Sequence, residues 1–259
     1  MIAGTRQQPV TFESSTHVKG SWKGLEAQEG ASLQVQNAVV RDAFEAIKTS
    51  QPTLDLVGVL CENCNDGMRC ASGNHSFSEC GFNSNDRGLL ISGSITSVTQ
   101  CTFQSNRWSI MVSGSSPVIS SNRFANGTTE IEMHDFSTPV ISHNLFAGAR
   151  EPSSFGIYMT GKEGISPVIV NNTFTNYAYG CLVEPPEAGF SLARPVLRNN
   201  IFYTNLYSAR WGGPIGGATM YGDGDFLYNN VYNDDWQSYQ PRTIHRNMWG
   251  ISRLIPCSL

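Results

Sequence analysis

A short phrase returns at nearly regular intervals along the 259-residue chain and constrains the fold more than any other feature. It consists of Pro-Val, a few small residues and then Asn-x-Phe. The asparagines of successive copies, spaced 22, 28, 28 and 30 residues apart, are Asn122, Asn144, Asn172, Asn200 and, in a degenerate copy, Asn230. Self-similarity at this period is typical of a solenoid, in which each repeat forms one coil that packs on its neighbours.

The residue pattern inside each repeat favours β-strands over helices. Short alternating runs of Val, Ile and Phe are interrupted by Gly, Ser, Asn and Pro. About twenty residues suffice for one coil of a parallel β-helix, and stacked coils lie roughly 4.8 Å apart. We therefore expect the asparagines to form a ladder, hydrogen-bonded to bend backbone and to one another. The Phe two residues later should stack inside the core.

Earlier copies extend the repeat toward the N-terminus. Cys80-Gly-Phe and Cys101-Thr-Phe occupy the Asn-x-Phe position, and Asn37-Ala-Val looks like a more degenerate copy. The result is about nine coils with no linker or composition break, which predicts a single all-β domain.

Composition excludes some partners. The 17 Lys and Arg against 21 Asp and Glu give a net charge of −4, so there is no electrostatic case for nucleic acid. No apolar run approaches membrane-spanning length, so we expect no membrane partner. Residues 1–10 lack the layout of a signal peptide.

The Pro-Val-Ile-x-x-Asn-x-Phe units resemble the right-handed parallel β-helix repeat proteins of the pectate-lyase-like group, as do Gly-Thr-Arg-Gln-Gln-Pro-Val-Thr-Phe at 4–12 and Ser-Trp-Lys-Gly at 21–24. The resemblance covers roughly residues 2–232 and implies a right-handed parallel β-helix, secreted or at the cell surface in its full-length form. It does not select a function, because the group includes lyases, glycoside hydrolases, epimerases and non-catalytic surface proteins.

We expect residues 1–240 to form the solenoid and residues 241–259 an irregular tail, because the alternation is lost after Tyr239. Proteins of this type often end in Gly-Asn-Ile-Ser-Ala-Asp-Pro-Leu-Phe, and the codons for residues 249–258 permit that phrase in another reading frame. We hypothesise that the tail is frameshifted; a divergent cap is the alternative. Unpaired strand edges at the ends of the solenoid would permit end-to-end self-association.

Candidate functional residues lie on the strand that follows each bend, in the runs 88–93, 109–114, 130–135, 156–161, 180–185 and 217–222. Alternation leaves two outward rows. One reads Leu90, Met111, Glu132, Tyr158, Leu182 and Thr219, and the other reads Ser92, Ser113, His134, Thr160, Glu184 and Tyr221. The loops flanking the later strands lengthen at 148–155, 161–164, 185–192, 206–216 and 222–225. They are expected to wall a groove that binds a polysaccharide.

This face suggests a carbohydrate-active enzyme, either a lyase or a glycoside hydrolase. β-Elimination on a uronate polymer would use His134 or Lys162 as base and Tyr158 or Tyr221 as acid. The predicted set adds Tyr179 and Trp211 as substrate contacts. Ca²⁺ would be bound by the carboxylates of Asp135, Glu184, Asp223 and Asp225.

Hydrolysis would need two carboxylates about 5–5.5 Å or 6.5–9.5 Å apart. Glu132 and Glu184 lie two coils apart, roughly 10 Å by ladder spacing, and Asp135 is no better placed against Glu184. The catalytic signatures of pectate lyases and polygalacturonases are absent from the chain.

A non-catalytic glycan-binding or surface module is the alternative. It predicts an exposed aromatic stripe, formed by Tyr158, Tyr177, Tyr179 and Trp211, without convergent acids. His134 and Asp135 would then be a solvated surface pair, and the Gly-Asp-Gly-Asp segment at 222–225 a turn.

The seven cysteines have three interpretations. Cys61 and Cys64 form one zinc-like pair without a second pair at matching spacing. Inward or bend positions predict buried free thiols at Cys70, Cys80, Cys101 and Cys181. A disulfide between Cys80 and Cys101, on adjacent coils, is the other arrangement.

Overall fold

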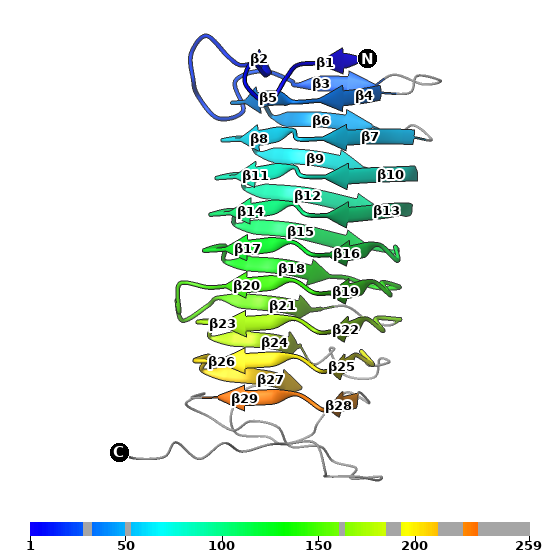
Figure 1. Ribbon diagram of the computed structural model, residues 1–259, viewed down its shortest axis with the longest axis vertical. Helices are drawn as coiled ribbons and strands as arrows, with labels where there is room; N and C mark the ends of the chain where they lie inside the picture. The colour runs from blue at the N-terminus through cyan, green and yellow to red at the C-terminus, as the bar shows by residue number, and fades with distance from the viewer. Residues whose placement is uncertain (28–32, 50–52, 161–163, 185–192, 212–224, 233–259) are drawn as a thin grey trace.

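The computed structural model describes residues 1–27, 33–49, 53–160, 164–184, 193–211 and 225–232. Within these ranges every helix or strand assigned is a β-strand, and the strands wind in stacked coils around one long axis (Figure 1). All strand pairing is parallel and forms three sheets of ten, ten and nine strands. The predicted β-helix is therefore confirmed, whereas the predicted tail at 241–259 lies outside the described residues.

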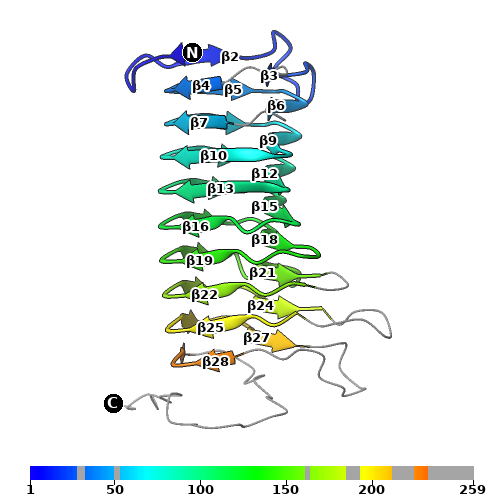
Figure 2. The same ribbon diagram turned by 90° about the vertical axis from the view of Figure 1, so that its right-hand side faces the viewer.

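Each of the first nine coils contributes one strand to each sheet, and the last described coil adds β28 and β29 to the first two. The turned view shows the strands of successive coils directly beneath one another (Figure 2). The first sheet holds β1 (Ile2–Ala3), β4 (Leu33–Gln36), β7 (Thr53–Val57), β10 (Gly73–Ser78), β13 (Ser94–Thr99), β16 (Val118–Ser120), β19 (Val140–Ser142), β22 (Val168–Val170), β25 (Val196–Arg198) and β28 (Asp225–Leu227).

The second sheet follows it in every coil. It holds β2 (Val10–Phe12), β5 (Ala38–Arg41), β8 (Leu60–Glu62), β11 (Gly81–Asn83), β14 (Thr102–Gln104), β17 (Arg123–Ala125), β20 (Leu145–Ala147), β23 (Thr173–Thr175), β26 (Ile201–Tyr203) and β29 (Asn230–Tyr232).

The third sheet carries the strands on which the functional residues were predicted. It holds β3 (Leu25–Ala27), β6 (Glu45–Thr49), β9 (Asp66–Cys70), β12 (Arg87–Ser92), β15 (Trp108–Ser113), β18 (Thr129–Met133), β21 (Phe155–Met159), β24 (Tyr179–Val183) and β27 (Tyr207–Trp211).

A column of phenylalanines occupies the core behind the second sheet. Its fully buried rings are those of Phe82, Phe103, Phe124, Phe146, Phe174 and Phe202. Neighbouring rings stack with centroids 4.5 to 4.9 Å apart. This is the coil spacing, so each ring packs on its equivalents in the coils above and below, as predicted.

The bend between the first and second sheets, here called the first corner, holds the predicted asparagine ladder. Asn144 shows its hydrogen bonds. Its side-chain amide donates to the Ile119 carbonyl at 2.9 Å and to Asn172 Oδ1 at 3.0 Å. Its Oδ1 accepts from the backbone and side-chain nitrogens of Asn122 at 2.8 and 3.0 Å. The ladder therefore satisfies buried polar groups of the bend.

Two members of the predicted ladder were wrong by one residue. The last is Asn229 rather than Asn230, because Asn229 Oδ1 accepts from the backbone and side chain of Asn200. Ala38, rather than Asn37, holds the early position. The residue before each ladder member adopts a positive φ, as Asn37 does at 48°, and asparagine tolerates that conformation well. Adjacent positions therefore both favour Asn, and the sequence alone did not separate them.

The bend between the second and third sheets, here called the second corner, holds a shorter ladder. Asn85 donates from its backbone and side-chain nitrogens to Asn106 Oδ1 at 2.9 and 3.1 Å, and Cys64 donates its backbone N–H to Asn85 Oδ1. In later coils Asn205 Oδ1 accepts the backbone N–H of Tyr177 at 3.0 Å.

The six cysteines in the described ranges are buried free thiols. Their burial at Cys70, Cys80, Cys101 and Cys181 confirms the prediction for these four. On the third sheet Cys70 pairs with Ile91, and Cys181 pairs with Ile157 and with Ala209. Among the described residues there is no helix long and apolar enough to cross a membrane.

Candidate functional site

The outer face of the third sheet brings together the predicted row of Met111, Glu132, Tyr158 and Leu182, which pair directly from β15 to β24. Side chains of the second predicted row follow two positions later, at Ser113, His134, Thr160 and Glu184. The candidate site consists of Glu132, His134, Tyr158 and Glu184 on this face.

The next member of the first row is Arg210, not Thr219, because Arg210 pairs with Leu182. The predicted run at 217–222 lies outside the described residues. A fixed spacing identifies the right strand: the third-sheet strand starts five residues after the core Phe in coils such as Phe103 to Trp108 and Phe202 to Tyr207. The sequence Gly-Ala-Thr-Met-Tyr-Gly resembled the earlier strands more closely than Ser-Ala-Arg-Trp, and that likeness was misleading.

Glu132 and His134 form the first pair of the site. His134 Nε2 lies 3.0 Å from Glu132 Oε1. The Glu132 side chain is 11% exposed and the His134 side chain 36% exposed, so the imidazole faces solvent while its partner is largely buried. The hydrogen bond to Glu132 raises the pKa of His134, burial opposes it, and the charge of Asp135 adds to the rise.

Tyr158 and Glu184 form the second pair. The Tyr158 hydroxyl donates to Glu184 Oε2, and the Thr160 hydroxyl donates to the same oxygen at 3.1 Å. Burial, and then the neighbouring carboxylate of Glu184, raise the pKa of Tyr158 above its usual value of 10. The phenol therefore keeps its proton at neutral pH and can donate it.

The two pairs adjoin through Glu132 and Tyr158, which are direct partners on adjacent coils, and Glu184 lies one coil beyond Tyr158. Chemically, the face offers an imidazole oriented by a carboxylate beside a phenol oriented by a second carboxylate. A proton acceptor and a proton donor held in this way are the elements of acid–base catalysis.

An aromatic column borders the site on the same face. The rings of Phe155, Tyr179 and Tyr207 stack at 5.4 and 4.9 Å, and the ring of Tyr158 packs against Phe155 at 5.1 Å. Because the rings stack on one another, much of each ring face is covered by its neighbour, whereas sugar stacking needs an open face. The predicted stripe is also wrong at Tyr177, which is fully buried.

Of the other predicted site residues, some lie in the described part of the chain and others do not. Asp135 is half-buried beside the first pair. Lys162, Tyr221 and Asp223 lie outside the described residues. Trp211 ends β27 and its backbone pairs with Val183, but its side chain lies outside the described part.

Asp225 and Glu184, two predicted ligands of the Ca²⁺ site, belong to different sheets. The backbone of Asp225 lies in β28 of the first sheet, paired with Val196, whereas Glu184 follows a strand of the third sheet. The described residues contain no group of three or more His, Cys, Asp or Glu side chains arranged to hold a metal. Asp223 and the side chain of Asp225, two of the predicted ligands, lie outside the described part of the chain.

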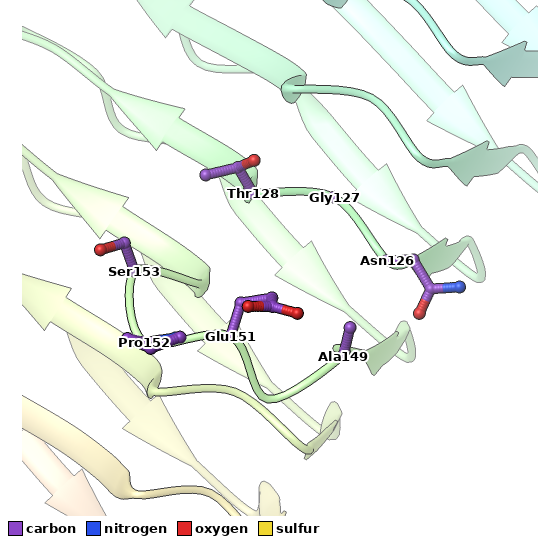
Figure 3. Close-up of a pocket in the computed structure, with 7 residues that line it drawn as sticks. All are labelled: Asn126, Gly127, Thr128, Ala149, Glu151, Pro152 and Ser153. Atoms are coloured by element: carbon purple, nitrogen blue, oxygen red, sulfur yellow. The ribbon is translucent and has the colours of Figure 1, made fainter.

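A pocket of about 340 Å³ opens at the other end of these strands, near their first residues. Figure 3 shows residues 126–128 on one side of it and Ala149, Glu151, Pro152 and Ser153 on the other. It forms where the loop at 148–154 leaves the regular coil path, as the predicted loop lengthening indicated. Its lining includes neither Glu132 nor His134, so the pocket is separate from the candidate site.

Glu130 is a buried acid that the sequence reasoning missed. Strict alternation places it outward with Glu132, but it is fully buried. The equivalent positions, Gly88, Gly156 and Gly180, are glycines whose added Cβ would meet backbone within 2.6 Å. A large charged residue at a position otherwise held by small ones was the available signal.

In a comparison with protein families, the right-handed beta helix region family matches residues 55–185, about half of the chain. Comparison with the curated proteins and with the solved structures found no match. The matched residues include Glu132, His134 and Tyr158, and their three-sheet coils are those of a parallel β-helix. The chain therefore belongs to the right-handed β-helix region family.

Proposed function

We propose that the chain is a polysaccharide lyase that acts at the outer face of its third sheet. The observation that carries the proposal is the Glu132–His134 pair at 3.0 Å beside Tyr158 of the next coil, whose hydroxyl is hydrogen-bonded to Glu184. β-Elimination needs a base and a proton donor close together, and these pairs supply one of each.

His134 serves as the base in this proposal. With the Nε2 proton directed at Glu132, the neutral imidazole has its lone pair on Nδ1, which removes the proton α to the carboxylate of a uronic acid unit. Glu132 orients the ring and stabilises the imidazolium that forms, the part that a carboxylate plays beside a catalytic histidine.

Tyr158 serves as the acid. As the α-proton leaves, the bond between the β-carbon and the glycosidic oxygen breaks and a carbon–carbon double bond forms. The departing oxygen takes the phenolic proton of Tyr158, which Glu184 and Thr160 hold in position. The products are a shortened chain and a new end bearing an unsaturated uronate.

Hydrolysis is less well supported by the same contacts. Both carboxylates already accept hydrogen bonds, Glu132 from His134 and Glu184 from Tyr158 and Thr160. They lie roughly 10 Å apart by ladder spacing, which is outside both separations that glycosidases use.

A panel of acidic and neutral polysaccharides tests the proposal, with unsaturated-product absorbance and reducing ends read in parallel. Lyase activity should give both signals on a uronate polymer, and Glu132→Gln and Tyr158→Phe should each lower it by on the order of 10²-fold or more. Glu151→Gln, which removes an exposed carboxylate on the pocket wall, is the matched control and should keep full activity.

The pH dependence supplies a second test. A base acts in its neutral form, and the pKa of His134 is raised above 6.5, so activity should rise as pH increases through that raised pKa. Reducing ends without unsaturated product would show that the enzyme is a hydrolase rather than a lyase. Glycan binding without any product, or equal activity of the Glu132→Gln and Glu151→Gln variants, would contradict the enzyme proposal.

A further inference from the structure

The asparagine ladder of the second corner is interrupted at Gly127, between β17 and β18, and the next coil carries the loop at 148–154, between β20 and β21. A buried cluster spans the interruption. Ladder positions hold Asn85 and Asn106 in earlier coils and Asn205 in a later one, but the position after Asn106 is Gly127, which has no side chain. A Cβ built on Gly127 would lie 2.7 Å from the Glu130 carboxylate. That carboxylate therefore fills the space of the missing asparagine.

Three donors converge on this carboxylate. Gly127 donates its backbone N–H to Oε1 at 2.9 Å, and Tyr177 donates its hydroxyl to the same oxygen at 3.1 Å. Ser109 donates its hydroxyl to Oε2 at 2.6 Å. Tyr177 belongs to the coil beyond the inserted loop, 47 residues from Glu130, so the bond joins coils on both sides of the interruption. These four residues are here called the Glu130 cluster.

The surroundings of the cluster favour the protonated acid. Glu130 is fully buried, all three donors are neutral, and no charged side chain in the described part of the chain acts on the carboxyl. Tyr177 is the titratable group that faces it. Burial and the adjacent Glu130 raise the pKa of Tyr177 well above 10, so the phenol stays neutral.

We propose that the Glu130 cluster is a proton-sensitive support of the interrupted coil, firm when the carboxyl is protonated and weakened when it ionises. Burial raises the pKa of Glu130 from 4.5 to about 7, although all three hydrogen bonds act in the opposite direction. The folded state thus binds this proton more tightly than the unfolded state. The stabilisation is complete below about pH 4.5 and is lost as pH rises to about 7.

Glu130→Gln tests the proposal because the amide keeps the shape and cannot ionise. Its oxygen can accept from Gly127 and Tyr177, and its nitrogen can donate to the Ser109 hydroxyl. Between pH 5 and pH 8, the unfolding constant of the wild type should rise relative to that of Glu130→Gln by on the order of 50-fold, from the difference between 4.5 and about 7. Denaturant unfolding at each pH measures this ratio.

Glu151→Gln is the control, since it removes an exposed carboxylate from the same inserted loop, and its unfolding curve should follow the wild type at every pH. Hydrogen exchange, corrected for the intrinsic effect of pH, locates the change: protection of residues 126–133 and 176–179 should fall at pH 8 in the wild type. Parallel pH curves for wild type and Glu130→Gln would overturn the proposal.

If Glu130→Gln does not fold, Tyr177→Phe replaces it. Removing one donor to the carboxylate should raise the pKa of Glu130 further and shift the loss of exchange protection to higher pH. An unshifted loss would overturn the proposal equally. Neither test depends on the enzymatic activity proposed above.

Discussion

In the first corner, Cys80 and Cys101 occupy the positions that asparagines occupy in the later coils. The Cys101 thiol donates to the Phe77 carbonyl at 3.6 Å, 24 residues earlier, and the Cys80 thiol donates to the Leu56 carbonyl at 3.6 Å. Asn144 donates to the equivalent carbonyl at 2.9 Å. The corner therefore needs a small buried donor, and the amide adds a strong acceptor that the thiol lacks.

The outer face of the third sheet also differs between the early coils and the later coils. In the early coils Arg87 binds Asp66 through two hydrogen bonds, at 2.6 and 3.0 Å, and Asp66 is buried. That carboxylate is already paired and covered, so it is not placed to act on a ligand. In the later coils His134 is partly exposed beside Glu132, so one region has a covered carboxylate where the other has an imidazole open to solvent.

The largest expected effect concerns the phenylalanine column, which the early and later coils share. Phe103→Ala and Phe146→Ala should each lower the free energy of unfolding by about 3–5 kcal/mol, because each leaves a cavity in the same ring column. Denaturant unfolding of both variants measures the two costs. If one costs less than half of the other, the column is not the common core of both regions.

The next effect compares an asparagine position with a cysteine position of the first corner. Asn144→Ala should cost about 3 kcal/mol, because it leaves the Ile119 carbonyl and the Asn122 backbone N–H without their buried partner. Cys101→Ala is the comparison and should cost about 1 kcal/mol, since its hydrogen bonds are long and weak. Equal costs would show that thiol and amide are equivalent at this corner.

The smallest effect extends the ladder. Cys101→Asn should stabilise the fold by up to about 1 kcal/mol, because the introduced amide would accept from the Cys80 backbone and donate to the Phe77 carbonyl and to Asn122. Denaturant unfolding under reducing conditions measures the change in the free energy of unfolding. A clear loss of stability would mean that the early corner is too narrow for an amide.

The sequence predicted the coils, the Phe column and the two outward rows as far as Glu184, because each depends on a repeated residue in a fixed register. It failed where the register was interrupted or ambiguous. Tandem asparagines concealed whether Asn229 or Asn230 belongs to the ladder. Alternation does not apply to the first positions of the third-sheet strands, where the chain bends and both Glu130 and Ile131 turn inward.

The Glu130 cluster was also out of reach because it depends on a contact across 47 residues. No repeat rule links Gly127, which lacks a side chain, to a tyrosine in a later coil. Loop insertions such as 148–154 break the local spacing, and the compensating contacts then come from unrelated positions.

Titration of His134 by NMR tests most directly whether the later coils bring reactive groups into one coupled site. We expect a pKa above 6.5 in the wild type and a pKa below 6.5 in Glu132→Gln, because the lowering by burial then outweighs the smaller rise from the charge of Asp135. The Glu151→Gln variant should titrate like the wild type. An imidazole that titrates at 6.5 in all three proteins would contradict the proposed pair and the active site built on it.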